Sequence, residues 1–366
     1  MKKLLFFIFI FFISVFSCFA EDANILPSQT GIVQTVEYID LDGGEYTQTK
    51  QIAEIKLLKG DLKGEKVTVD NMLTGNPNYD IKLKKGMKVV LHVEKSDDGL
   101  MFSVEDIERS GVLVVLGLIF CALLIYVGKE KGLCSLVSIC LTCFLIFYLL
   151  SPMILTGINP ALATLITCLL ATLVTMYLVG GFNKKSTSAA IGCVLSLLTA
   201  GILSYLTVKF ASLTGFSGEN SMFLYSAHPE LDFISIVIST MMLATLGAVM
   251  DVGMSIASTI NEIYSVDNTK TIKELFLSGM NVGRDIIGTM ANTLILVYLG
   301  GSLPLILLAS NIDLQKFFNL NQVVTEIASA LIGSSAIVIC VPITAIVASE
   351  LVSRIKQNDD FSNFGK

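Results

Sequence analysis

Gly247-Ala-Val-Met-Asp251-Val-Gly-Met-Ser-Ile-Ala-Ser258 ends one hydrophobic segment of the chain, and Asn281-Val-Gly-Arg284-Asp285-Ile-Ile-Gly288-Thr-Met-Ala-Asn292-Thr begins the next. The apolar residues on both sides of a polar loop predict a hairpin of two membrane helices, from about Gly247 to Leu308. Ionisable side chains at membrane depth are energetically costly, and those that occur usually have a function. The hairpin therefore holds the first candidates for a functional site.

The composition of the whole chain is that of an integral membrane protein. Its 366 residues have a mean hydropathy of +0.72 and include 53% hydrophobic residues, but only 15% charged ones. Soluble domains carry about 25% charged residues. Residues 21–110 account for the whole net charge of −6, with 17 acidic and 11 basic residues. Basic patches interleaved with aromatic residues are absent, so we expect no nucleic-acid partner.

The first part of the chain predicts an exported segment followed by a small β domain. Residues 1–20 have two lysines, an apolar stretch and small residues at the end, as in a signal peptide or an uncleaved anchor. In residues 21–110, short alternating or β-branched runs are separated by glycine-rich turns. This pattern predicts five or six strands in a barrel-like domain. We expect this domain to lie outside the cytoplasm and to serve as a structural or partner-docking module.

Residues 111–355 predict a polytopic α-helical membrane domain with about seven spans, because each spanning helix needs about 20 mostly apolar residues. Basic residues concentrate after the odd-numbered spans, so the positive-inside rule places the β domain outside the cell and the tail, residues 356–366, in the cytoplasm of a plasma-membrane protein. The predicted spans are 111–128, 133–151, 159–179, 187–208, 233–254, 285–309 and 323–349.

Two loops have amphipathic stretches. Thr271-Ile-Lys-Glu274 matches a capping box, and the apolar residues after it predict a cytoplasmic helix, interfacial or merely connecting, that ends near Gly279 or Gly283. On the other side of the membrane, Ile312, Leu314, Phe317 and Phe318 are predicted to lie on the outer interface.

The candidate site is a polar cluster near the inner leaflet. Its predicted members are Asp251, Arg284, Asp285, Asn281, Thr289 and Asn292, with Glu326 near the outer end of the last span. Oxygen ligands of this kind suit a hard cation or a proton relay. A small-residue stripe around Asp251, from Ala244 to Ser258, is predicted to face another helix. The alternative is structural: Asp251 or Asp285 pairs with Arg284 and clasps the hairpin.

Other chemistry finds little support in the sequence. His92 and His228 have no cysteine or histidine neighbours, so we expect no zinc site. We find no serine–histidine–acid set, P-loop or HExxH motif, and expect neither an enzyme nor a bound cofactor. Cys140-Leu-Thr-Cys143 has redox-motif spacing, but it lies inside an apolar span. We interpret these cysteines as small packing residues.

Three motifs resemble the YibE/F family of bacterial multi-span membrane proteins. They are Gly247 to Ser258, Gly283-Arg-Asp-Ile-Ile-Gly-Thr-Met-Ala-Asn-Thr-Leu-Ile-Leu296, and Glu326-Ile-Ala-Ser-Ala-Leu-Ile-Gly333 through Val341-Pro-Ile-Thr344. The resemblance covers residues 110–355, and an extracytoplasmic domain ahead of them also fits. It implies a polytopic plasma-membrane protein without a settled biochemical activity. No site residue is therefore carried over from the family.

Two functions remain as hypotheses. The first is a permease or exporter-like protein for a small solute or ion, in which the polar cluster is a gate or an ion site. The second is a cell-envelope scaffold or sensor that docks an envelope protein through residues 21–110. The lipid bilayer is a partner in both cases, and the sequence leaves a homo-oligomer open.

Overall fold

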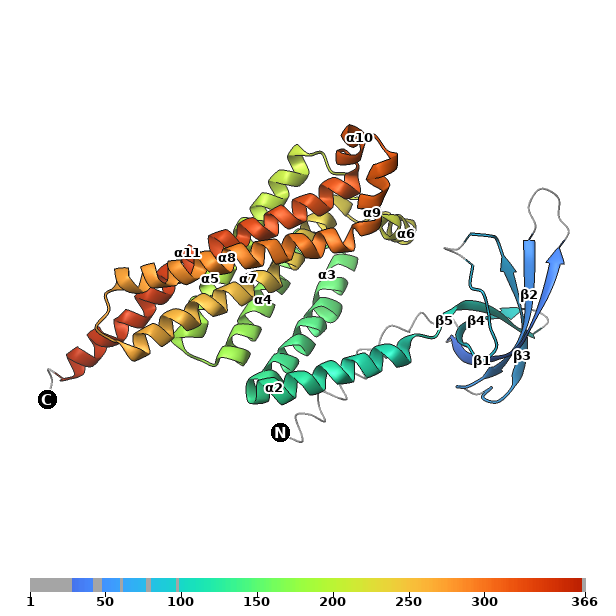
Figure 1. The fold of residues 1–366 in the computed structure, drawn as a ribbon, viewed down its shortest axis with the longest axis horizontal. Helices are drawn as coiled ribbons and strands as arrows, with labels where there is room; N and C mark the ends of the chain where they lie inside the picture. The colour runs from blue at the N-terminus through green and yellow to red at the C-terminus, as the bar shows by residue number, and fades with distance from the viewer. Residues whose placement is uncertain (1–27, 42–47, 60–61, 77–79, 97–98, 364–366) are drawn as a thin grey trace. The chain divides into compact units, whose positions relative to one another are not determined.

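The computed structural model describes residues 28–41, 48–59, 62–76, 80–96 and 99–363. The chain divides into two compact units, Met1–Gly128 and Lys129–Lys366. Each unit has its own hydrophobic core, and Figure 1 draws the strands of the first and the helices of the second. The predicted signal segment, residues 1–20, lies outside the described residues.

The first unit contains a five-stranded antiparallel sheet with the strand order β3-β2-β1-β4-β5. Register shifts after Val33 and after Val90 bend two strands, because an irregular residue increases the local twist. The two outer strands of the sheet, β3 and β5, approach each other. The predicted barrel-like β domain is therefore confirmed. Its strands are β1 (Gln29–Leu41), β2 (Gln48–Leu57), β3 (Lys66–Leu73), β4 (Lys88–Ser96) and β5 (Gly99–Ile107).

Alternate residues of the strands build the core of this sheet. Ala53, Ile55 and Leu57 of β2 are buried, as are Val89 and Leu91 of β4. Successive side chains of a strand point to opposite faces, so this spacing of two places one apolar set inside. Burial of this alternating apolar set therefore stabilises the sheet.

One polar side chain, Gln51, is completely buried in the same core. Its Oε1 accepts hydrogen bonds from the backbone N–H of Leu83 (3.0 Å) and from Asn71 Nδ2 (2.9 Å). Its Nε2 donates to the carbonyl oxygen of Leu83 (3.3 Å), while Asn71 also donates to the carbonyl oxygen of Ile81 (2.7 Å). These bonds attach residues 81–83, which belong to no strand, to β2 and β3.

The remaining elements are helical. They are α2 (Ser110–Leu145), the π-helical turn η1 (Ile146–Leu150), α3 (Ser151–Leu155), α4 (Pro160–Gly180), α5 (Lys184–Phe210), α6 (Glu219–Ala227), α7 (Phe233–Val266), α8 (Ile272–Gly301), α9 (Leu303–Leu308), the 3₁₀ turn η2 (Ala309–Asn311), α10 (Leu314–Phe318) and α11 (Asn321–Asn363).

Six helices of the described chain are long and apolar enough to cross a membrane. The first of them, Ser110–Leu155, has 46 residues, which at about 1.5 Å per residue correspond to about 69 Å of helix in total. This is more than twice the thickness of the hydrocarbon core, about 30 Å. Lys129 interrupts the helix with non-helical torsion angles (φ 50°, ψ −126°). The segment therefore has room for both of the first two predicted spans, 111–128 and 133–151.

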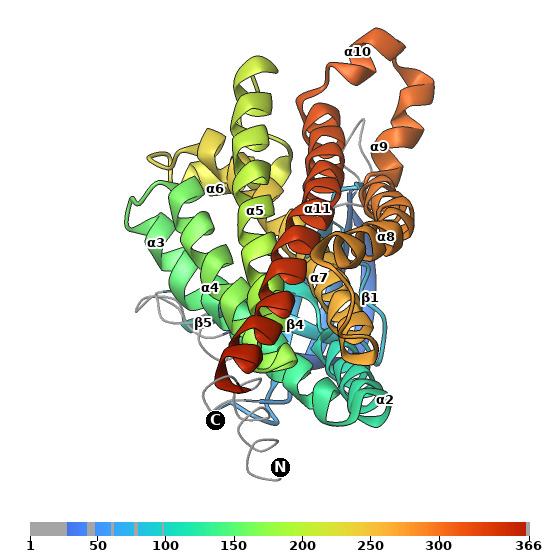
Figure 2. The same ribbon diagram turned by 90° about the vertical axis from the view of Figure 1, so that its left-hand side faces the viewer.

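Helices α5, α7 and α11 form the centre of the membrane unit and pack on one another, with α4 on one side and α8 on the other (Figure 2). Small residues allow these close approaches. Gly253 of α7, for example, lies against Cys193 of α5, because a β-carbon at Gly253 would come within 2.5 Å of the cysteine sulfur. Gly192 of α5 faces Thr344 of α11 in the same way.

The predicted break between a cytoplasmic helix and span 285–309 is wrong. The capping box at Thr271 is confirmed, but it starts one continuous helix, α8, that runs to Gly301. Gly279 and Gly283 do not end it. They lie on its buried face, where Ile260 of α7 and Val341 of α11 occupy the space of their missing β-carbons. These glycines therefore serve helix packing.

Other helices also extend past their predicted spans. Helix α7 runs to Val266, although its predicted span ends at residue 254, and α11 runs from Asn321 to Asn363 through most of the predicted tail. Hydropathy marks the apolar part of a helix, whereas backbone hydrogen bonds continue into polar sequence. The last three residues, 364–366, lie outside the described part of the chain.

The buried amide of Gln51 generates the first prediction. We expect Gln51→Leu to lower the free energy of unfolding of the β domain by about 1–3 kcal/mol, because the N–H and C=O of Leu83 lose their buried partner. Hydrogen exchange of the full-length protein should show faster exchange at residues 81–83. Thr68→Val is the matched control, since Thr68 is exposed on β3. Equal exchange in both variants would show that Gln51 does not hold this segment.

The contact at Gly283 generates the second prediction. Gly283→Ala should destabilise the helical bundle by about 1–3 kcal/mol through overpacking against Val341, and Val341→Ala in the same chain should restore part of the loss. The free energy of unfolding of each variant, measured in mixed detergent micelles, tests this prediction. Gly300→Ala, at an open position of the same helix, should be neutral or stabilising, because alanine favours helices. If Gly283→Ala and Gly300→Ala unfold alike, the packing role of Gly283 is wrong.

Candidate functional site

The residues of the predicted polar cluster lie at three places in the membrane unit. Asp251 belongs to α7. Asn281, Arg284, Asp285, Thr289 and Asn292 belong to α8, and Glu326 belongs to the first turns of α11. The first two groups lie on neighbouring helices, since α7 and α8 pack on each other. Glu326 lines a pocket at the other end of α8.

Asp251 lies on an exposed face of α7. The buried face of this helix carries large apolar residues such as Val249, Val252 and Ile256, which fill the core shared with α5 and α11. The small residues Ala244 and Gly247 are exposed beside Asp251. A β-carbon at Gly247 would meet no atom within 4 Å, so no helix of the described chain covers this position, and a protein contact of the stripe stays a prediction. Helical spacing predicts the stripe, but the large apolar residues on the opposite face of α7 are the ones buried in the core.

Asp251 lies well inside the long helix α7. It lies 18 residues after the first residue of the helix and 15 before the last, close to the middle of α7. From the first residue of α7 this is about 27 Å at about 1.5 Å per residue, so the level of Asp251 near the inner leaflet stays a prediction. Asp285 is likewise 13 residues from the start of α8 and 16 from its end.

The polar residues of α8 share the face that points away from α7 and α11. Asn281, Arg284, Asp285, Thr289 and Asn292 are all exposed. The buried positions of the same helix are Leu275, Gly279 and Gly283. We define the α8 polar face as these five exposed residues together with Gly288.

The predicted ion-pair clasp is not formed. Arg284 Nη1 donates a hydrogen bond to Asn281 Oδ1 at 2.9 Å, on the same helix. Within the described ranges, neither Asp251 nor Asp285 has an ion pair with a basic residue. Both carboxylates thus stand on exposed faces of apolar helices without a cationic partner.

Two contacts set the relative level of the antiparallel helices α7 and α8. Gly279 lies against Ile260, and Gly283 lies against Ile256. Continuing this register by five residues places Asp251 level with Gly288. Asp285 and Asn292 of α8 are each about one helical turn from that level, so the polar residues of both helices lie in one zone along the bundle, although those of α8 point away from α7.

The chemistry of this zone is that of oxygen ligands. Asp251, Ser255, Asp285 and Thr289 offer carboxylate and hydroxyl oxygens, which suit hard cations or proton transfer. Among the residues that the structure describes, no three histidine, cysteine, aspartate or glutamate side chains gather as a metal-binding group.

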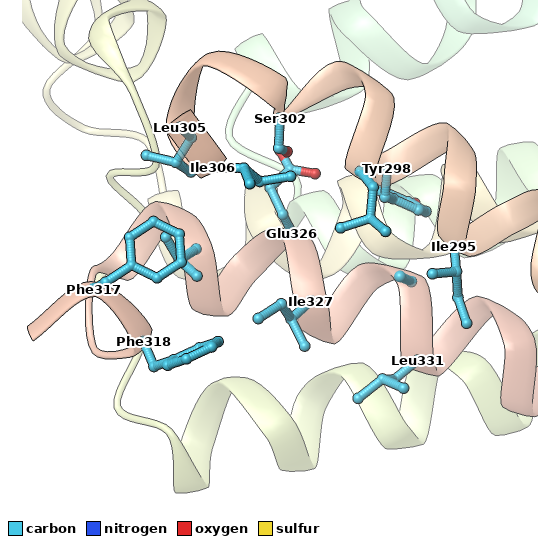
Figure 3. Close-up of a pocket in the computed structure, with 13 residues that line it drawn as sticks. Ile295, Tyr298, Ser302, Leu305, Ile306, Phe317, Phe318, Glu326, Ile327 and Leu331 are labelled. Atoms are coloured by element: carbon cyan, nitrogen blue, oxygen red, sulfur yellow. The ribbon is translucent and has the colours of Figure 1, made fainter. Parts of the chain in front are cut away.

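Glu326 lines a cavity of about 320 Å³ at the ends of α8 and α11 (Figure 3). Its carboxylate points toward the α8–α9 turn at Ser302. Most of the wall is apolar, with Tyr298, Phe317 and Phe318 among the lining residues. Phe317 is buried here, so the predicted interfacial segment also closes a pocket. No sequence pattern predicts this cavity, because its wall combines residues of four helices.

Sequence reasoning also missed a pair of thiols in the core. Cys193 of α5 and Cys340 of α11 both donate to the carbonyl oxygen of Val249, at 3.4 and 3.7 Å. They are far apart in the chain, and no spacing rule connects them. Their contacts show a packing role at the centre of the bundle.

Comparison with known proteins agrees with this architecture. The model of the YibE/F-like protein family matches residues 116–354, and the model of the YibE/F family N-terminal domain matches residues 28–107. No curated protein and no solved structure matches the chain. Together the two family models cover nearly the whole chain, the membrane helices and the β domain alike. The chain belongs to the YibE/F family.

Proposed function

We propose that this membrane protein is a permease or exporter-like protein for a small solute or ion. The observation that carries the proposal is Asp251, a carboxylate without an ion-pair partner among the described residues, on the exposed face of an apolar helix. We assign Asp251 and Ser255 to the pathway, as a gate or an ion site.

Energetics support this assignment. A carboxylate inside a bilayer is costly, by at least about 2.5–3.5 kcal/mol at the centre, and such residues face a water-filled cavity or a partner. Around Asp251 the side chains are small, as at Ala244 and Gly247, so a hydrated ion or solute has room beside the carboxylate. A helix that serves only as a membrane anchor does not need an unpaired carboxylate beside small residues.

The proposal includes a location and an orientation. We place the protein in the plasma membrane, with the β domain outside the cell and the C-terminus in the cytoplasm. The charges of the loops support this orientation through the positive-inside rule. We propose no catalytic step and no bound cofactor.

A second function fits the separate β domain. Its own hydrophobic core makes it suitable as an extracytoplasmic module that docks an envelope protein, with the helices as an anchor. This scaffold hypothesis makes a different prediction: cellular function should survive replacement of residues 111–355 by an unrelated membrane anchor. A transporter would lose its function in that chimera.

The transport proposal predicts a specific loss in Asp251→Asn. In proteoliposomes, fluorescent probes can follow the flux of H⁺, K⁺ and Mg²⁺ separately. We expect the wild-type protein to conduct one of them and Asp251→Asn to reduce that flux at least tenfold, because the amide removes the charge that attracts the cation. Glu262→Gln is the matched control on the same helix, near its end, and should leave the flux within about twofold.

The result that would contradict this site is an unchanged flux in folded Asp251→Asn protein. Equal losses in Asp251→Asn and Glu262→Gln would also count against it, since they would indicate a general effect of charge. Retained cellular function in the anchor chimera would favour the scaffold.

A further inference from the structure

The α8 polar face has no covering element in the described chain. Helix α8 packs on α7 and α11 through its opposite side, where Gly279 and Gly283 make close contacts. On the polar face, a β-carbon at Gly288 would meet no atom within 4 Å. Asn281, Arg284, Asp285 and Asn292 are all exposed around it.

Lipid is a poor cover for such a face. An arginine, an aspartate and two asparagines within 12 residues of a membrane helix each carry a cost in hydrocarbon, and polar membrane residues normally face protein or water. Gly288 adds a second property, because glycine lets the backbone of another helix approach closely. Asparagine side chains also form hydrogen bonds between membrane helices.

We propose that the α8 polar face binds the same face of a second copy of this chain in a parallel two-fold dimer. The argument rests on charge complementarity. The face carries one cation, Arg284, and one anion, Asp285, and they do not pair within the chain. In a two-fold interface the same patch meets itself, so each kind of contact occurs twice.

The helical geometry places these charges correctly for such a pair. At about 100° per residue, Arg284 and Asp285 lie on opposite flanks of the line through Asn281, Gly288 and Asn292. A two-fold axis parallel to the membrane normal keeps both α8 helices parallel and at equal depth. It brings Arg284 of each copy beside Asp285 of the other, which neutralises both charges.

The spacing of the face supports a continuous helix–helix seam. The face includes residues at intervals of 4, 3 and 4, namely Asn281, Asp285, Gly288 and Asn292. Such alternating intervals are typical of helices that pack in a left-handed coil. Gly288 then lies at the closest approach, with an asparagine on either side. This dimer does not depend on transport, because Asp251 on α7 is not part of the interface.

Charge reversal tests the interface directly. Arg284→Asp and Asp285→Arg should each weaken self-association at least tenfold, as measured by co-purification of two differently tagged full-length copies from the same membranes and by photobleaching steps in liposomes. The double variant R284D/D285R should return to within about threefold of the wild-type protein, since every pair is again oppositely charged. Restoration by the double variant also shows that these chains fold.

A cross-link provides the second measurement. Asn292→Cys should form disulfide-linked dimers in oxidised membranes, because the two copies of this residue lie near the axis. Leu170→Cys, on an exposed position of α4, is the control and should give no more dimer than the parent protein with its native cysteines. A monomeric wild-type protein, unaffected single reversals, or equal cross-linking at the two positions would overturn the proposal.

Discussion

The structure depends on one constraint: a polar side chain on a membrane helix needs protein, water or a solute beside it. In the centre of the bundle this need is met internally. Ser196 and Thr245, for example, are buried, and their hydroxyls donate to the carbonyl oxygen four residues earlier. Asp251 of α7 and the α8 polar face lie instead on faces that the described part of the chain leaves open.

The same constraint connects packing with function. Large apolar residues of α7 occupy the core against α5 and α11, and this orientation turns Asp251 outward. The glycines of α8 play the corresponding role on the neighbouring helix. Because Gly279 and Gly283 accept Ile260 and Val341, α8 lies close to its neighbours and presents its polar side away from them. Exposure of the polar residues is thus a consequence of the core.

Much of the fold was readable from the sequence. Alternation predicted the β domain, and Thr271 with Glu274 predicted the start of α8, because these signals are local. Hydropathy located the membrane segments but not the ends of their helices, because α7 and α11 extend beyond the apolar residues into polar sequence. Gly279 and Gly283 predict a helix end, but glycine occurs both where helices end and where they pack closely, and here it serves packing. Spacing alone predicts the α7 stripe but not what covers it, because no local signal identifies the neighbours of a helix.

The central claim is that the zone around Asp251 contacts water and not lipid. Reaction of Gly247→Cys with a membrane-impermeant thiol reagent, in intact membranes and against the parent protein, tests it most directly. Gly247 is exposed and has no neighbour that a side chain would displace. We expect Gly247→Cys to react at least tenfold faster than Ile166→Cys, an exposed apolar position on α4. Equal, slow reaction at both positions would contradict the account.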